Sequence, residues 1–252
     1  MGRWMLAGLA TALIVNSAHA NVVTIGTSRD TTIYSDNTTA SNGAGPHFYV
    51  GNTQSGGARR GLLAFNIAAA VPVGATITSV SLTLYESKGQ FPDGVFDLHK
   101  LTKTWGEGAS NAGDPGGTGA AAQAGDATWA DNVLSTAQWN VPGGDFDSAR
   151  VSSTQIVGGA GQSYTWPSTS TLVADAQAWL NSPLTNFGWI MLGDEANPGT
   201  AKRFETKEAF NSSQAPALTI NYSVPEPASI GVVAIGLIGL TARRSRRNRT
   251  AA

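Results

Sequence analysis

Hydrophobic and polar residues alternate along much of the chain, a pattern typical of half-buried β-strands. In residues 77–85, Val80, Leu82 and Leu84 fall on one face and Ser and Thr residues on the other. The same alternation recurs at residues 60–67, 95–101 and 217–222. Residues 187–192 are apolar on both faces, as in a central strand. Turn sequences containing Gly, Pro and Asn separate these runs, so the pattern predicts an all-β domain.

One segment has helical spacing instead. In residues 170–181, apolar side chains recur every three to four positions, and Ser170 or Thr171 is expected to cap the start. Residues 106–123, rich in Gly, Ala and Asp, are expected to form a long exposed loop. Many short strands with one short helix predict a β-sandwich of the jelly-roll type.

The N-terminus has the three parts of a secretory signal peptide at residues 1–20. Arg3 supplies the positive charge, residues 4–15 form an apolar run, and Ala18 and Ala20 fit the small-residue cleavage pattern. We expect cleavage after Ala20. The alternative is an uncleaved anchor, but the run is shorter than the roughly 20 residues that a spanning helix needs.

The C-terminus also has three parts. Pro225-Glu226-Pro227 within residues 224–229 comes first, and its prolines end the preceding strand. An apolar segment at 230–242 is predicted to be a transmembrane helix. The basic end at 243–249 would stay on the cytoplasmic side, which places the body outside; its arginines include Arg243, Arg244, Arg246 and Arg247.

In this order, the three parts resemble the PEP-CTERM sorting signal of Gram-negative bacteria that make exopolysaccharide. The resemblance covers residues 223–249. It implies that an exosortase, a membrane cysteine protease, recognises Pro225, Glu226 and Pro227 and processes the tail. The alternative is an ordinary tail anchor that contains these residues by accident.

The body, residues 21–222, resembles a DNRLRE domain, an extracellular β-sandwich related to a family of carbohydrate-binding modules. The pieces that carry the resemblance include residues 30–34, 48–51 and 60–66 and the motifs around Trp105 and Trp129. The resemblance implies a sandwich fold and a role among extracellular polysaccharides.

Charge narrows the classes of ligand. Charged residues make up 13% of the chain, against about 25% in an average globular protein. Residues 21–222 contain ten Lys and Arg against sixteen Asp and Glu, a net charge of −6. Nucleic-acid binding requires clustered basic residues, so nucleic acid is not an expected partner of the body. The chain has no cysteine, which excludes thiol catalysis and thiolate metal sites.

No nucleophile elbow, His-Glu-x-x-His motif or phosphate-binding loop occurs in the sequence. Two carboxylate pairs could in principle serve a glycosidase, but sequence does not fix their separation in space. Carboxylate oxygens also suit calcium, and we consider a structural calcium ion bound by Asp194, Glu195 and Glu205.

Three tryptophans flank polar loops and are candidates for stacking on sugar rings: Trp105, Trp129 and Trp139. The alternative is that they pack in the core, where aromatic side chains bury large areas.

These observations predict an exported, surface-sorted, non-catalytic protein of the exopolysaccharide matrix, either carbohydrate-binding or structural. It would lie at the cell surface or in the extracellular matrix, with the C-terminal helix as a transient or permanent membrane anchor. The alternatives are a polysaccharide lyase or glycoside hydrolase, and a purely structural matrix component.

Overall fold

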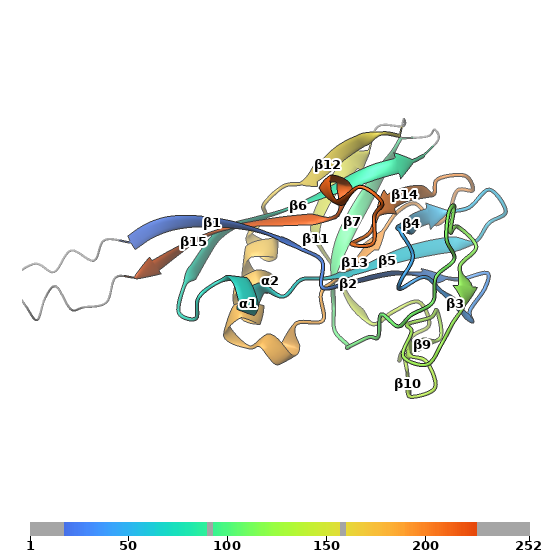
Figure 1. The fold of residues 1–252 in the computed structure, drawn as a ribbon, viewed down its shortest axis with the longest axis horizontal. Coiled ribbons are helices and arrows are strands. Elements are labelled where there is room, and N and C mark those ends of the chain that lie inside the picture. Colours follow the sequence, from blue (N-terminus) through green and yellow to red (C-terminus); the bar gives the residue numbers. More distant parts are fainter. Residues whose placement is uncertain (1–17, 90–92, 157–159, 226–252) are drawn as a thin grey trace, which may run out of the picture.

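The computed structural model describes residues 18–89, 93–156 and 160–225. The predicted sorting helix at 230–242 and the basic end at 243–249 lie outside these residues. Within them, no helix has the length and apolar character needed to cross a membrane. The described part is mostly β, as the alternation predicted (Figure 1).

The strands are β1 (Ala18–Gly26), β2 (Arg29–Tyr34), β3 (Ala40–Ser41), β4 (His47–Asn52), β5 (Ala58–Ala64), β6 (Thr76–Lys88), β7 (Gly94–Leu101), β8 (Ala120–Ala121), β9 (Asp131–Val133), β10 (Ala137–Gln138), β11 (Phe146–Ile156), β12 (Gln162–Trp166), β13 (Trp189–Leu192), β14 (Lys202–Glu205) and β15 (Ala217–Pro225). The helices are α1 (Ile67–Ala70) and α2 (Ser170–Asn181), with short 3₁₀ turns η1 (Pro183–Thr185) and η2 (Ser212–Gln214).

Eleven strands form one large antiparallel sheet. Its order is β1-β15-β6-β14-β4-β5-β13-β7-β11, with β12 beside β6 and β2 beside β5. Strand β4 joins two halves of this path, because its first residues pair with β14 whereas Gly51 and Asn52 pair with β5. Hydrogen bonding is therefore continuous, and the described strands do not show the predicted closed sandwich or jelly roll.

The buried side chains form two clusters. The larger contains residues from β6, β14 and β15 and also from β5, β7 and β13, and the inner face of α2 packs on it. In β5, Leu63 belongs to this cluster and the adjacent Leu62 to the second. In β13, Trp189 belongs to the larger cluster and Ile190 to the second. Both faces of these strands are buried, which explains the doubly apolar run at 187–192 and confirms its central position.

The predicted helix is confirmed as α2, but its cap is not one of the expected residues. Thr169 precedes the helix, and its Oγ1 accepts the N–H of Leu172 at 3.1 Å. Ser170 and Thr171 are already helical. The predicted strand at 60–67 ends earlier, at Ala64, and its last residue, Ile67, begins the short helix α1, whose three alanines favour a helical turn.

The segment 106–123 is largely an irregular loop, as expected, but it is only partly exposed. Ser110 is fully buried, and Ala120 and Ala121 pair with β3. The hydroxyl of Tyr34 donates to the carbonyl of Gly116 at 3.2 Å. Glycine allows parts of this segment to lie close to their neighbours, as at Gly106 and Gly119, so its abundance here partly reflects packing.

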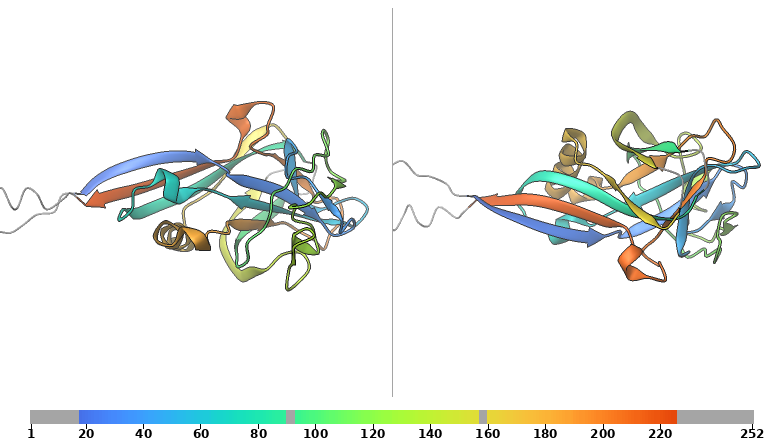
Figure 2. Two further views of the ribbon diagram at one scale, coloured as in Figure 1. Left: turned by 60° about the horizontal axis from the view of Figure 1, so that its bottom comes forward. Right: turned by 90° about the horizontal axis from the view of Figure 1, so that it is seen from above.

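The two ends of the body meet. Strands β1 and β15 pair from Ala18 opposite Pro225 to Gly26 opposite Ala217. They form a ribbon that projects from one end of the molecule, and the loops around β4 and β5 lie at the other end (Figures 1 and 2). The ribbon extends three residues beyond each predicted bound of the 21–222 body.

Candidate functional site

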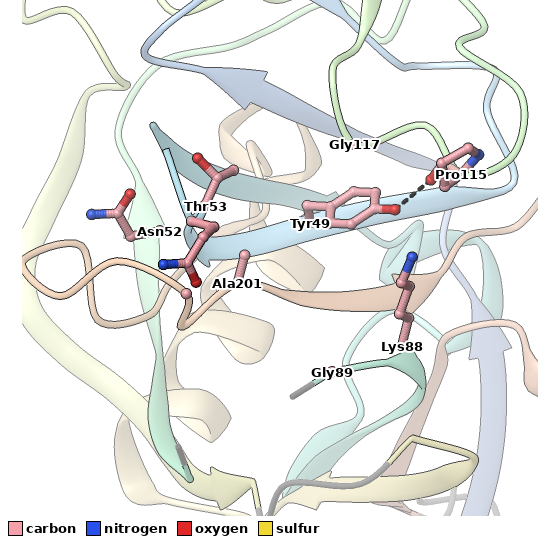
Figure 3. Close-up of a pocket in the computed structure, with 10 residues that line it drawn as sticks. Tyr49, Asn52, Thr53, Lys88, Gly89, Pro115, Gly117 and Ala201 are labelled. Carbon is pink, nitrogen blue, oxygen red and sulfur yellow. Dashed lines mark hydrogen bonds between the residues drawn. The ribbon is translucent and has the colours of Figure 1, made fainter. Parts of the chain in front are cut away.

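A pocket of about 370 Å³ lies near the end of the molecule that is opposite the termini. Its walls come from β4 and the turn after it, the end of β6, and two loops (Figure 3). The lining residues are Tyr49, Asn52, Thr53, Gln54, Lys88, Gly89, Pro115, Gly117, Gly199 and Ala201. It thus combines one aromatic ring with amides, a hydroxyl and an ammonium group.

Tyr49 forms the aromatic wall because of the alternation in β4. Phe48 and Val50 point into the core, whereas Tyr49 points outward and is half-buried. Its hydroxyl donates to the carbonyl of Pro115, which fixes the ring (Figure 3). A Cβ on Gly117 would lie 3.4 Å from Cζ of Tyr49, so glycine lets this loop lie close to the ring. Burial raises the pKa of Tyr49, against the opposing charge of Arg203, and the hydroxyl stays neutral.

Asn52 contributes a buried polar group that is only partly satisfied. The residue is 5% exposed, and its Nδ2 donates to the carbonyl of Glu195 at 2.8 Å. Its Oδ1 has no hydrogen-bond partner among the described residues. A buried acceptor without a partner costs stability, so this amide is held in place at an energetic cost.

Lys88 contributes the charge. It is exposed and forms no ion pair within the described ranges. Its neighbour across the β6–β14 ladder is Arg203. Unlike Lys88, Arg203 forms an ion pair, with 2.7 Å between its Nη1 and Oδ1 of Asp114. The pocket therefore carries a positive charge on a body whose net charge is negative.

The wall at residues 200–201 depends on Gly51. Its φ of +109° lies in a region that favours glycine, and a Cβ there would lie 2.9 Å from the carbonyl oxygen of Thr200. The hydroxyl of Thr200 in turn accepts the N–H of Asn52 at 3.0 Å. The turn that closes this side of the pocket is thus held directly against β4.

The structure does not bring the three proposed calcium ligands together. Hydrogen bonds from Asn197 and Ala196 lower the pKa of Asp194 and occupy its carboxylate within its own turn. Both carboxylate oxygens of Glu195 accept from Arg60, at 2.7 and 2.8 Å. Among the described residues, no set of three acidic or histidine side chains is arranged to hold a metal ion.

The third proposed calcium ligand, Glu205, lies beside a histidine. Its Oε1 is 3.0 Å from Nδ1 of His47, and both side chains are buried. Burial raises the pKa of Glu205, but the nearby His47, Ser87 and Arg203 outweigh this and leave it below its usual value. This carboxylate is therefore engaged by its neighbours on β4 and β14.

Two of the three candidate tryptophans are buried. Trp105 is 1% exposed and donates its Nε1–H to the carbonyl of Phe187, and Trp139 is 5% exposed and donates to that of Thr128. Both belong to the second core cluster, so neither offers a ring face to a sugar. Trp129 is half-buried, and the guanidinium of Arg60 lies 4.6 Å from its ring centroid.

The residues predicted for processing lie at the opposite end from the pocket. Ala18 and Ala20 are in β1, opposite Pro225 and Ser223, and Pro225 is the exposed last residue of β15. Glu226, Pro227 and the arginines from Arg243 to Arg247 lie outside the described residues.

The sequence reasoning missed the Tyr49 pocket. The signal that could have found it is an outward-facing aromatic residue between two core positions, followed within a few residues by the polar run Asn52-Thr53-Gln54. What sequence does not give is the return of the loops at Pro115 and Gly199 to the same place.

Comparison with known families gives one match, at the C-terminus. Residues 223–247 match the PEP-CTERM protein-sorting motif. The motif implies an exported protein that is processed by exosortase and sorted to the cell surface. No curated protein matches the sequence. The match covers only the tail, so the resemblance of the body to DNRLRE domains stays a prediction.

Proposed function

Starting from a chain that is exported and sorted through its PEP-CTERM motif, we propose that the body is a non-catalytic carbohydrate-binding module of the exopolysaccharide matrix. In this proposal it is a DNRLRE-like β-sandwich, and it binds a segment of polysaccharide in the Tyr49 pocket.

The observation that carries the proposal is the ring of Tyr49 in one pocket with the polar residues Asn52, Thr53 and Gln54. Sugars present hydroxyl donors and acceptors around rings with apolar faces. An aromatic side chain packs against such a face, and a few placed polar groups fix the orientation. Asn52, Thr53 and Gln54 supply these polar groups.

The location of the pocket also supports this function. Strand β1 begins and β15 ends at one end of the body, and β4, which lines the pocket, lies near the other end (Figures 1 and 2). A body that is anchored through its C-terminus would therefore present the pocket away from the membrane, toward the extracellular polysaccharide. A polysaccharide chain could reach the pocket without approaching the bilayer.

The proposal is tested by measuring the affinity of residues 21–225 for a panel of neutral and acidic polysaccharides. We expect Tyr49→Ala to weaken binding by about tenfold, because an aromatic contact contributes about 1 kcal/mol beyond the area it buries. The matched control is Tyr85→Ala, which removes a tyrosine ring that does not line the pocket. If wild-type protein binds none of the panel, or if Trp129→Ala and not Tyr49→Ala abolishes binding, the Tyr49 proposal is wrong.

The same preparations separate binding from the alternatives. New reducing ends or unsaturated products from the bound polysaccharide would identify a glycoside hydrolase or a lyase and overturn the non-catalytic assignment. A deletion strain that loses its matrix, combined with a protein that binds no glycan, would indicate a purely structural component.

A further inference from the structure

The ribbon that ends the body crosses the predicted site of signal cleavage. Three pairs join residues before that site to the first residues of the matched sorting region: Ala18 with Pro225, His19 with Val224, and Ala20 with Ser223. The next pair, Asn21 with Tyr222, is the first that lies wholly within the predicted mature chain.

On its other side, β15 has a shorter neighbour. The ladder with β6 ends at the pair of Ser223 with Thr76. Among the described strands, Val224 and Pro225 therefore pair with β1 alone. Val224 is also half-buried against the main core, which keeps the segment in place beside the sheet.

Signal cleavage removes these pairs. Water adds across the Ala20–Asn21 amide, so that Ala20 leaves as a carboxylate with the signal segment and Asn21 gains a free amino group. The ladder then ends at Asn21 and Tyr222, and Val224 and Pro225 have no neighbouring strand. The outcome is the same if the body folds only after cleavage, because a chain that begins at Asn21 cannot form the three pairs.

Proteins that bind a peptide in extended form often do so by pairing with its backbone N–H and C=O groups. A segment whose groups are already paired in a sheet must first open locally, which lowers the fraction available. We propose that removal of the signal segment exposes Val224 and Pro225 to the sorting protease, so that signal cleavage precedes tail processing. The proposal rests on cleavage after Ala20.

The test restores the lost pairs in the mature protein. Inserting Thr-Val-Thr directly after Ala20 keeps the cleavage pattern but adds three strand-forming residues to the new N-terminus, opposite Ser223, Val224 and Pro225. The matched control inserts Gly-Pro-Gly, which has the same length but lacks one backbone donor and pairs poorly. The full chain, with an epitope after Ala252, is expressed in cells that contain the exosortase, and loss of the epitope is followed over time.

We expect the Thr-Val-Thr chain to lose its tail about tenfold more slowly than wild type, since backbone hydrogen bonds must open first. The Gly-Pro-Gly chain should be processed at the wild-type rate. N-terminal sequencing checks that each mature chain starts where intended. Equal rates for the two insertions, whether slow or fast, would overturn the proposal, as would a wild-type mature chain that does not begin at Asn21.

Discussion

At the scale of single residues, Asp30 in β2 is the most perturbed carboxyl group. It is fully buried, and its Oδ2 accepts from the Thr27 hydroxyl at 2.6 Å and from the Lys207 N–H at 3.0 Å. Its Oδ1 has no partner among the described residues. Burial raises the pKa of Asp30 to about 7, although the bond from Thr27 opposes this. The folded protein therefore holds a proton on Asp30 that the unfolded chain releases near pH 4.

This shift predicts how stability changes with pH. Between about pH 4 and pH 7 only the folded state binds the proton, so Asp30 destabilises the fold progressively as the pH rises, by about 4 kcal/mol in total. Asp30→Asn mimics the protonated group and keeps an oxygen for Thr27 and Lys207. We expect its urea midpoint to match wild type at pH 4 and to exceed it increasingly up to pH 8. A difference that is independent of pH would contradict this assignment.

The residue scale is also where sequence reasoning about the site failed most. Polar loops flank Trp105, Trp129 and Trp139 in the sequence, which predicts exposed rings, but two of the three rings are buried in the fold. The carboxylates of Asp194, Glu195 and Glu205 suit calcium by their chemistry, but each is engaged by a neighbour in space, such as Arg60 for Glu195. A sequence shows which groups are present; which partners they find depends on long-range contacts.

At the scale of elements, the hydrophobic period predicted the type of structure well. Residues 77–85 are the centre of β6, and residues 170–181 are α2 without any change of bounds. The exact start of a helix is harder to predict when it depends on one side chain, as the N-cap of α2 shows. Thr169 was missed because its extended backbone and its bond to Val151, 18 residues earlier, have no periodic signal.

The cap gives a direct prediction. Thr169→Ala removes the bond that its Oγ1 accepts from Leu172 and the 2.7 Å bond that it donates to the Val151 carbonyl. We expect the free energy of unfolding to fall by about 1–2 kcal/mol. The control is Ser170→Ala at an exposed helical position, which should change stability by less than about 0.5 kcal/mol. The opposite ranking in urea denaturation would restore Ser170 as the cap.

At the scale of the whole molecule, the sequence predicted a β-rich exported body but not the order of the strands in its sheet. The pairing of β4 with both β14 and β5 depends on the positive φ of Gly51, and no local pattern shows which strands meet there. The sequence also did not predict that β1 begins and β15 ends at the same end of the molecule, because this follows from the pairing of the first strand with the last.

The position of the termini predicts different effects at the two ends of the molecule. A folded domain fused directly before Asn21, after an intact signal peptide, would lie beside the sorting motif. We expect it to slow loss of the tail severalfold, because it crowds the same end of the ribbon. Affinity of the body for polysaccharide should stay within twofold of wild type, because the pocket is distant. A fusion that weakens binding but leaves processing unchanged would contradict the arrangement.

The position of β15 between β1 and β6 has a mechanical consequence. In a body that is anchored through its C-terminus, a pull on the distal end would load β15 from the end nearest the anchor. The hydrogen bonds to both neighbours lie across that direction. They are therefore loaded together in shear and do not open one after another like a zipper. The chain, which has no disulfide cross-link, would in this way resist being drawn out of its own sheet.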